Sequence, residues 1–446
     1  MRSKRFSRGI TALLANLVLS AAATLAAAQH EAVLYRFQGL GDGAQPQSTV
    51  IAHQGFLYGT ASDAGDLTCN FSGCGTVFQM IPPASSGNPW TQNVLYTFLG
   101  GNDGAAPWGS LIVDKSGNLY GTTYIGGADT GCQNKYGCGT VFQLSPGTGG
   151  VWTETVLYRF QGGGDGAFPE TSLTLDSTGN LFGTTTEGGQ GTCSGGSTGC
   201  GTVFELSPPA APGGLWTENI IHFFENGSDG SFPQTGLVMG NQGVLYGGAT
   251  SGGGCSHPGG CGTVFQLSPP SVLGASWTFT TLYNFSGSND GINPGGLVLK
   301  QGALFGMATN SSTGLGGTVF KLSPSQNGPW IETLLHTFSL TQYSDGWSPT
   351  GGIAFDPYGN IYGVTNSGGT GLCNFGCGVV FELSPPAPPN TTWTETVLHN
   401  FHGTDGIYPN GLVLGGSALY GTTYGGGQVC SVYNARGCGV VFEVRP

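Results

Sequence analysis

The chain has 446 residues and a formal net charge of −12, and only 8% of the residues are Asp, Glu, Lys or Arg. This acidic balance disfavours binding to nucleic acid or to an anionic membrane surface. The 84 glycines disfavour a helical protein, because glycine is unfavourable inside helices. No amphipathic helical pattern follows the first 28 residues, and no later apolar run approaches the roughly 20 residues that span a bilayer.

Residues 1–28 have the pattern of a secretory signal peptide. Basic residues between Arg2 and Arg8 precede an apolar stretch, Ile10–Leu25, and Ala26–Ala28 form a small-residue cleavage site. Its removal takes away four of the 12 Lys and Arg and none of the 24 Asp and Glu, leaving a formal charge of −16. We therefore expect residues 29–446 to be exported, to the extracellular medium, the cell surface or the periplasm, without a membrane span.

The mature chain repeats one unit seven times, at intervals of roughly 60 residues. Each unit contains an apolar run, an Asp-Gly pair, a Pro, a second apolar run, Leu-Tyr-Gly or a variant of it, a Gly-rich loop and Gly-Thr-Val-Phe or a variant. The aspartates of the pairs are Asp42, Asp103, Asp165, Asp229, Asp290, Asp345 and Asp405.

Each unit predicts four short strands. In the third unit these are Ser172–Asp176, Asn180–Thr185, Gly201–Leu206 and Trp216–Phe224, which alternate apolar and polar residues and are rich in β-branched types. One four-stranded unit cannot bury both of its faces alone, so seven units predict a ring. We expect an all-β fold: one domain, residues 29–446, forming a seven-bladed β-propeller of antiparallel blades.

The two ends of the mature chain predict how the ring closes. Val33–Phe37 has the sequence of a fourth strand, whereas Gly439–Val444 has that of a third strand. We expect the first strand to be the outer strand of blade seven, paired with residues 439–444. Strands that alternate in direction also place the Asp-Gly loop and the loop between the second and third strands on one face.

The cysteines occur as six close pairs, each in the loop between a second and a third strand. Disulfides are the preferred interpretation for an exported chain, and zinc is the rival. Zinc sites tolerate little variation in ligand spacing, whereas these separations vary. The pairs are Cys69 with Cys74, Cys132 with Cys138, Cys193 with Cys200, Cys255 with Cys261, Cys373 with Cys377, and Cys430 with Cys438.

Motifs of the unit resemble those of the GloVer tandem-repeat family, exported bacterial repeat proteins grouped with choice-of-anchor proteins. The resemblance rests on Leu119–Thr123, Gly126–Gly127, Cys138–Phe142 and Trp152–Tyr158, and it recurs in order over residues 33–446. It implies a surface or secreted repeat protein and transfers no activity. The chain ends at Pro446 without a sorting tail, which departs from the anchored members of the family.

The seven Asp-Gly aspartates are candidate ligand-binding residues, with three interpretations. An Asp in a turn commonly accepts hydrogen bonds from nearby backbone amides, and this structural role is preferred. A calcium site is the second interpretation; calcium needs several oxygen ligands, and these loops lack a dense Asp/Asn pattern. Direct contact with a substrate is the third. We expect no cofactor, with calcium as the alternative.

A second candidate set consists of aromatic residues close to the proline of the unit. Aromatic rings stack on sugars, and they also fill the space between blades, which is the preferred role because five blades share the feature. The residues are Trp108, Phe168, Phe232, Trp347 and Tyr408, with Gln45 and Asn293 in blades one and five. His222, His336 and His399 take the place of a strand tyrosine, and Glu154, Glu218, Glu332 and Glu395 are interpreted as cross-strand partners.

No catalytic set stands out, so the sequence assigns no catalytic residues and leaves the question of enzymatic activity open, with the balance against it. We expect a monomeric, non-catalytic binding or scaffold protein for a polysaccharide or a surface protein. An extracellular carbohydrate-active hydrolase or lyase is one alternative. A structural component of the cell envelope is another.

Overall fold

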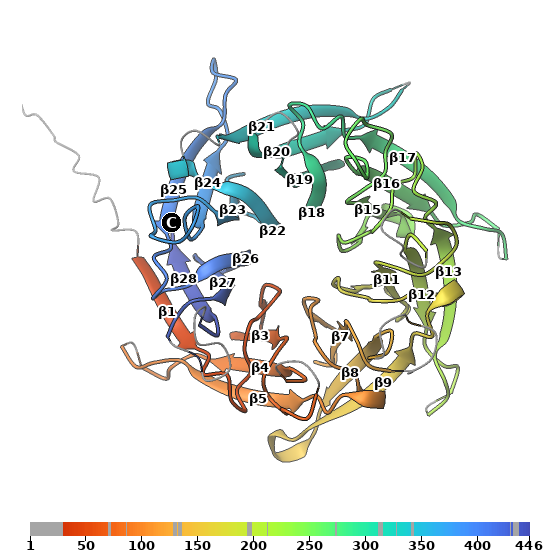
Figure 1. The fold of residues 1–446 in the computed structure, drawn as a ribbon, viewed down its shortest axis with the longest axis vertical. Coiled ribbons are helices and arrows are strands. Elements are labelled where there is room, and N and C mark those ends of the chain that lie inside the picture. The colour runs from red at the N-terminus through yellow and green to blue at the C-terminus, as the bar shows by residue number, and fades with distance from the viewer. Residues whose placement is uncertain are drawn as a thin grey trace, which may run out of the picture.

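The computed structural model is a ring of seven sheets around a central channel (Figure 1). It describes residues 30–69, 73–85, 87–127, 132, 136–193, 199–211, 213–272, 274–310, 315–326, 328–339, 343–428, 430 and 437–446. The proposed signal peptide, residues 1–28, lies outside this part of the chain. The described residues form 28 strands and five short 3-10 turns but no α-helix. No helix among them is long and apolar enough to cross a membrane.

Each sheet has four antiparallel strands and forms one blade. Blade one contains β2 (Ile51–His53), β3 (Phe56–Ala61), β4 (Thr76–Ile81) and β5 (Thr91–Thr97), and blade two contains β6 (Ile112–Val113), β7 (Leu119–Thr123), β8 (Thr140–Pro146) and β9 (Trp152–Arg159). Blade three contains β10 (Thr174–Leu175), β11 (Leu181–Thr185), β12 (Thr202–Ser207) and β13 (Thr217–Phe223). Blade four contains β14 (Val238–Met239), β15 (Leu245–Ala249), β16 (Thr263–Ser268) and β17 (Thr278–Asn284). Blades five and six contain β18 (Ile292–Lys300), β19 (Ala303–Asn310), β20 (Leu315–Ser323) and β21 (Ile331–Ser339), and β22 (Trp347–Phe355), β23 (Ile361–Ser367), β24 (Val379–Ser384) and β25 (Thr394–Asn400). The 3-10 turns are η1 (Gly101–Asp103), η2 (Thr148–Gly150), η3 (Gly163–Asp165), η4 (Asn241–Gly243) and η5 (Tyr343–Asp345).

Blade seven joins the two ends of the chain. It contains β26 (Ile407–Gly415), β27 (Ala418–Gly425), β28 (Val440–Arg445) and, as its outer strand, β1 (His30–Arg36). The register of the antiparallel pair runs from His30 opposite Arg445 to Arg36 opposite Val440. The predicted seven-bladed propeller, closed by its first strand, is confirmed.

The blades are held together by seven edge-to-face phenylalanine pairs. In each pair, a phenylalanine that ends the outer strand of one blade meets the phenylalanine of the third strand of the next blade. The ring centroids lie 5.0 to 5.3 Å apart, in the orientation that aromatic pairs prefer. The pairs are Phe37–Phe78, Phe98–Phe142, Phe160–Phe204, Phe224–Phe265, Phe285–Phe320, Phe338–Phe381 and Phe401–Phe442. All the third-strand members are fully buried.

The inner strands of blades one to four are shorter than the sequence indicates, whereas those of blades five, six and seven span 9 residues each. In the third unit, Ser172–Asp176 is predicted, whereas β10 spans Thr174–Leu175. Beside this short strand a hydroxyl contact links the two segments, since Thr171 Oγ1 and Thr184 Oγ1 are 2.9 Å apart. In blade five the ladder extends further along the chain, and Pro294 pairs with Ala308.

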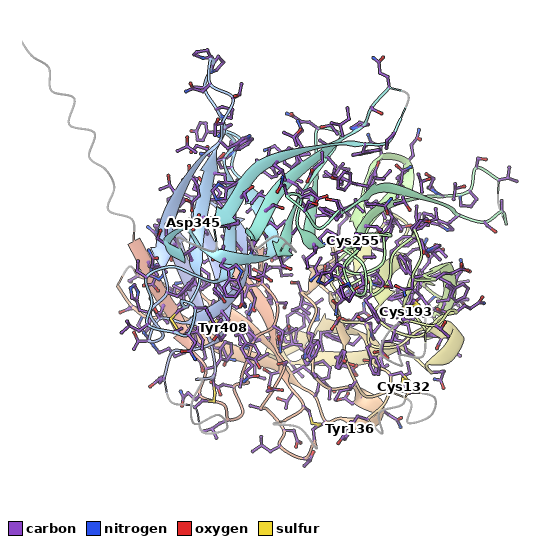
Figure 2. All side chains as sticks on the ribbon, turned by 45° about the horizontal axis from the view of Figure 1, so that its top comes forward. Cys132, Tyr136, Cys193, Cys255, Asp345 and Tyr408 are labelled. Carbon is purple, nitrogen blue, oxygen red and sulfur yellow. A yellow bond between two sulfur atoms is a disulfide. The ribbon has the colours of Figure 1, made fainter. Side chains whose placement is uncertain are left out.

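All six predicted cysteine pairs form disulfides, with Cα atoms 5.1 to 5.8 Å apart. Figure 2 marks Cys132, Cys193 and Cys255, which come from the loops between second and third strands of blades two, three and four. These loops contact the Asp-Gly loops of their own blades, since Gly127 N–H donates to Gly101 O at 2.8 Å and Gly189 N–H donates to Gly163 O at 2.6 Å. The two kinds of loop therefore share one face, as predicted.

Candidate ligand site at the channel mouth

The segment that enters each blade is bent by the residue before its proline. This residue has a left-handed backbone in all seven blades, with φ between 51° and 60°, although none is glycine. The residues are Gln45, Ala106, Phe168, Phe232, Asn293, Ser348 and Tyr408. In six of them the N–H donates to the carbonyl of the second cysteine of the preceding blade, at 2.8 to 3.0 Å. A left-handed conformation is unfavourable for these residues and must be stabilised by the surrounding structure. The hydrogen bond to the preceding blade is one of the contacts that stabilise it.

The bend places the residue after each proline at the channel. These seven residues are Gln47, Trp108, Glu170, Gln234, Gly295, Thr350 and Asn410, and all of them line a central cavity of about 920 Å³. Equivalent positions thus carry an aromatic ring, a carboxyl group, amides, a hydroxyl and a glycine. Glu170 is the one charged residue among the described residues that line the cavity. The seven blades repeat the same backbone arrangement, but the side chains that they place in the channel differ from blade to blade.

Glu170 is held by side chains from two blades. Its Oε1 accepts hydrogen bonds from Thr186 Oγ1 at 2.6 Å and from Gln234 Nε2 at 2.7 Å. Thr250 Oγ1 donates to Gln234 Oε1 at 3.2 Å, which orients the amide. Burial raises the pKa of Glu170, and the nearby charge of Glu187 raises it further. The hydrogen bonds from Thr186 and Gln234 lower the pKa and offset part of this rise.

An aromatic surface lies beside this carboxyl group. The rings of Trp108 and Tyr124 are stacked, with centroids 3.9 Å apart and planes at 7°. Tyr124 also meets Phe168, with centroids 5.0 Å apart. Burial, then the charges of Glu170 and Glu187, raises the pKa of Tyr124 to about 12, so its hydroxyl stays protonated. Trp108 thus lines the cavity together with Glu170 and Gln234, and Tyr124 packs against its ring.

The five aromatic candidates fall into three structural positions. Phe168, Phe232 and Tyr408 precede their prolines, whereas Trp108 follows its proline and Trp347 stands two residues before its own. Trp108 and Phe232 line the cavity. Trp347 packs edge-on against Phe375, with centroids 5.5 Å apart.

The Asp-Gly carboxylates point to the outer strands rather than to the channel. Asp165 is typical, since it accepts from Gln161 N–H at 2.8 Å and from the Tyr158 hydroxyl at 3.1 Å. Asp42, Asp103, Asp290 and Asp405 accept the same two kinds of bond, with His399 in place of Tyr at Asp405. Asp229 accepts from the Glu225 N–H at 2.9 Å, and His222 Nε2 lies 3.4 Å from its carboxylate. Asp345 accepts from the Ser339 N–H. None of the seven is among the described residues that line the cavity.

Sequence reasoning missed a carboxylate pair between neighbouring blades. Burial and the charge of Asp165 raise the pKa of Glu218 to about 7. Glu154, Glu332 and Glu395 likewise have pKa values raised to about 7, first by burial and then by Asp103, Asp290 and Asp345 respectively. These glutamates thus face an aspartate of the preceding loop, a relation that the spacing of the unit could have suggested.

Sequence reasoning also missed Glu170, Gln234 and Tyr124. The available signal was the position after the proline, which carries a different residue type in nearly every unit. The sequence analysis grouped the aromatic residues near the prolines, and this grouping did not separate the position after the proline from the positions before it.

The fold defines a seven-bladed β-propeller stabilised by local disulfides. The chain belongs to the Gloeobacter/Verrucomicrobia repeat family, whose model matches residues 22–193 and 191–442, and the predicted relationship is confirmed. No curated protein sequence matches the chain.

Three solved structures are similar in arrangement. The PQQ-bound aldose sugar dehydrogenase of Streptomyces coelicolor is 16% identical with a TM-score of 0.45, over 79% of this chain and 98% of that one. A putative oxidoreductase (glucose dehydrogenase) of Thermus thermophilus is 15% identical with a TM-score of 0.43, over 76% and 96%. The computationally designed Ika8 protein is 11% identical with a TM-score of 0.42, over 93% and 98%. No residue role is transferred from them.

Proposed function

We propose that the protein is an exported, non-catalytic binding protein that holds a sugar unit of a neutral polysaccharide at the channel mouth. The observation that carries this proposal is the stacked Trp108–Tyr124 pair beside the Glu170–Gln234 hydrogen bond. Ligand sites combine a largely apolar surface with a few convergent polar groups. A sugar ring offers an apolar face for the aromatic pair and hydroxyls for the carboxyl and amide groups.

Charge decides between neutral and acidic sugars. The chain carries 24 Asp and Glu against 12 Lys and Arg, and Glu170 is the charged residue of the described cavity lining. A uronic acid or sulfated sugar would bring a like charge to this carboxyl, with no cation in the described lining to offset it. Neutral sugars are therefore the proposed class.

The test is a glycan array with the purified protein, its Trp108→Ala and Glu170→Gln variants, and Trp347→Ala as the control aromatic variant. We expect selective binding to neutral glycans that weakens about tenfold or more in Trp108→Ala, corresponding to about 1.4 kcal/mol, and stays unchanged in Trp347→Ala. A blank array would contradict the proposal and move the assignment to a surface protein ligand or a structural envelope role. Loss of signal in chelator would instead favour calcium at the Asp-Gly loops.

A second candidate is a hydrolase or lyase that acts on the same sugars. The observation that favours it is the pKa of Glu170, which burial raises above its usual range, because a raised pKa makes a carboxyl group a better general acid toward a glycosidic oxygen. Incubation of bound glycans, followed by measurement of new reducing ends and of unsaturated products, separates the two candidates. An enzyme would form products that disappear in Glu170→Gln, whereas a binding protein would form none.

A further inference from the structure

The interface between blades six and seven is one of three in which a histidine, in place of a tyrosine, stands on the outer strand before the Asp-Gly turn. At the interface between blades one and two, the Tyr96 hydroxyl donates to Asp103 Oδ1 at 2.7 Å. Between blades six and seven, His399 takes the place of the tyrosine, and its Nε2 lies 2.9 Å from Asp405 Oδ2. An imidazole, which commonly binds divalent transition metals, thus stands where the other interface has a tyrosine hydroxyl.

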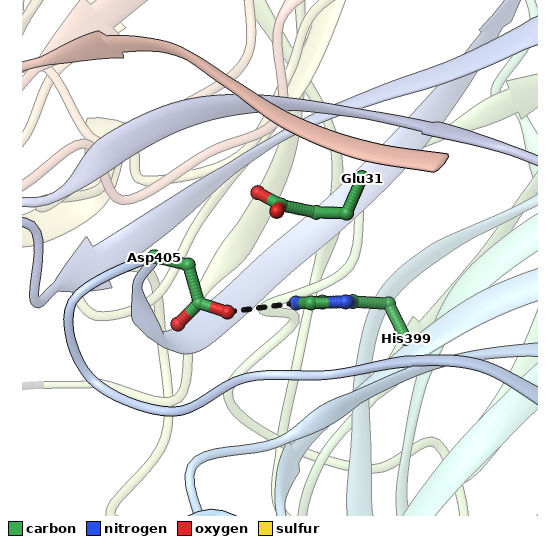
Figure 3. A group of neighbouring side chains, drawn as sticks. All are labelled: Glu31, His399 and Asp405. Atoms are coloured by element: carbon green, nitrogen blue, oxygen red, sulfur yellow. Dashed lines mark hydrogen bonds and ion pairs between the residues drawn. The ribbon is translucent and has the colours of Figure 1, made fainter. Parts of the chain in front are cut away.

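A third group reaches this place from the first strand of the chain. Glu31 lies on β1, at the position that Glu154 occupies in blade two, and it therefore faces the aspartate of the preceding loop. One ligand atom each from Glu31, His399 and Asp405 lies within 4.8 Å of the other two. Figure 3 shows the three side chains pointing toward one another from β1, β25 and the loop before β26.

A second histidine stands on the same loop. His402 Nδ1 is 3.8 Å from Asp405 Oδ2, and 54% of its side chain is exposed. The backbone N–H of His402 donates to Asp405 Oδ1 at 2.7 Å, which fixes the loop around the carboxylate. A solvent-exposed imidazole at the edge of the group gives an ion a path from solution.

We propose that Glu31, His399 and Asp405 bind one divalent transition-metal ion of the zinc type, with His402 as the fourth ligand. Imidazole nitrogen and carboxylate oxygen are zinc ligands at about 2.0 to 2.2 Å, in a tetrahedral arrangement. Tetrahedral ligand atoms at such bond lengths are about 3.3 Å apart, whereas the ligand atoms of Glu31, His399 and Asp405 lie within 4.8 Å of one another, so binding requires these atoms to approach by up to about 1.5 Å. Two carboxylates balance the charge of the ion, and the imidazoles favour zinc over calcium.

The preceding interface is an internal comparison. His336, Asp345 and Glu395 occupy the same three positions between blades five and six, but among the described residues they do not form a group as close as that of Glu31. No second histidine follows His336 in its loop. The same three residue types are therefore not sufficient to form a metal site. The proposed site differs from the preceding interface in the close approach of its three ligand atoms and in the presence of His402.

The ion would tie β1 to two further elements. β1 already pairs with β28, and the Arg36 guanidinium donates to Thr404 O at 3.4 Å. A metal bound by Glu31 and His399 adds a bond between β1 and the outer strand of blade six. The site would thus strengthen the closure of the ring.

The test is calorimetric titration of the purified, untagged protein with Zn²⁺, together with the visible spectrum of its Co²⁺ form. We expect one bound ion per chain, a tetrahedral Co²⁺ spectrum, and a higher unfolding temperature with Zn²⁺ than with chelator. His399→Tyr restores the Tyr–Asp–Glu set that other interfaces carry, so it should fold normally and bind Zn²⁺ at least tenfold more weakly. Glu31→Gln should weaken binding in the same way.

The matched control is Glu154→Gln, which changes the equivalent glutamate beside Tyr96 and should leave Zn²⁺ affinity unchanged. Absence of Zn²⁺ binding, or binding of equal affinity in His399→Tyr and Glu31→Gln, would overturn the proposal. Tighter binding of Ca²⁺ than of Zn²⁺ would also overturn it. These variants leave the channel residues intact, so the result does not depend on glycan binding.

Discussion

At the residue scale, the contact between neighbouring blades depends on a glycine and a proline. Gly201, which follows the second cysteine of blade three, has φ +98°, and a Cβ there would lie 2.5 Å from Pro233 Cδ of the next blade and 2.5 Å from Thr185 O. The glycine thus allows both the backbone conformation and the close approach. The same Cys-Gly pair contacts the next blade's proline at other interfaces, for example Gly139 with Pro169.

We predict that Gly201→Ala lowers the free energy of unfolding by about 2 kcal/mol or more, because it adds a steric clash to the strained φ. The measurement is chemical denaturation followed by tryptophan fluorescence. Gly359→Ala is the control, since Gly359 has φ +94° with open space around its Cβ position, and it should cost only the strain of φ. Equal losses in the two variants would show that the proline contact is unimportant.

At the element scale, each disulfide closes a short loop on the face that carries the Asp-Gly turns. Blade five contains no cysteine in its unit, yet β19 and β20 pair from Leu304 opposite Leu322 to Ala308 opposite Thr318. The strand pairing of a blade therefore does not require the bond. Its contribution is confined to the entropy of a loop of a few residues.

We predict that Cys132→Ala with Cys138→Ala lowers the free energy of unfolding by about 2 kcal/mol or less, the value that the chain-entropy model gives for so short a loop. Alanine is chosen because Cys138 is fully buried, and a serine there would bury a hydroxyl group. Denaturation curves of this variant and of the unmodified protein are compared without reductant. Failure of the variant to fold would show that the disulfide organises the blade.

At the scale of the whole molecule, carboxyl pairs between blades couple stability to pH. Glu154, Glu218, Glu332 and Glu395 have pKa values raised from the ordinary 4.5 to about 7, first by burial and then by a neighbouring aspartate. The folded protein thus binds more protons than the unfolded chain between these values, so its stability falls as pH rises through this window. One group acts in the opposite direction, since burial lowers the pKa of His336 to about 4.

We predict a larger free energy of unfolding at pH 5 than at pH 7.5, measured by urea denaturation at constant ionic strength. Glu218→Gln should flatten the dependence by removing one of the four contributions. Its fold should tolerate the change, because Gln92 stands at the equivalent position in blade one and donates to Asp42 O at 3.0 Å. Stability that rises steadily from pH 5 to pH 7.5 would contradict the prediction.

Much of the fold was predictable because the unit recurs in order. Seven Asp-Gly pairs predicted seven blades, the strand types at the two ends predicted the closure of β1 on β28, and the position of each cysteine pair predicted its disulfide. The extent of the inner strands was not predictable, because corresponding segments of the unit give a strand of 2 residues in blade three and one of 9 residues in blade five, a difference that strand propensity does not encode.

The candidate site was less accessible to sequence reasoning. Glu170 and Gln234 belong to different units and come together only when blades three and four are placed around the channel. The left-handed backbone of Phe168 and Phe232 is enforced by contacts between blades, and a bulky aromatic residue gives no local sign of it. Counting aromatic residues near the prolines therefore selected segments at the channel mouth but not the residues that meet there.

Closure by β1 has a consequence for how the molecule is made. His30, near the beginning of the chain, pairs with Arg445, near its end, so this contact has a very large sequence separation and its formation is entropically costly. During synthesis the ring cannot be completed before the last strand, β28, has emerged, and until then β1 lacks the strand with which it pairs. An incomplete or truncated chain would therefore expose an open sheet edge, a feature prone to aggregation.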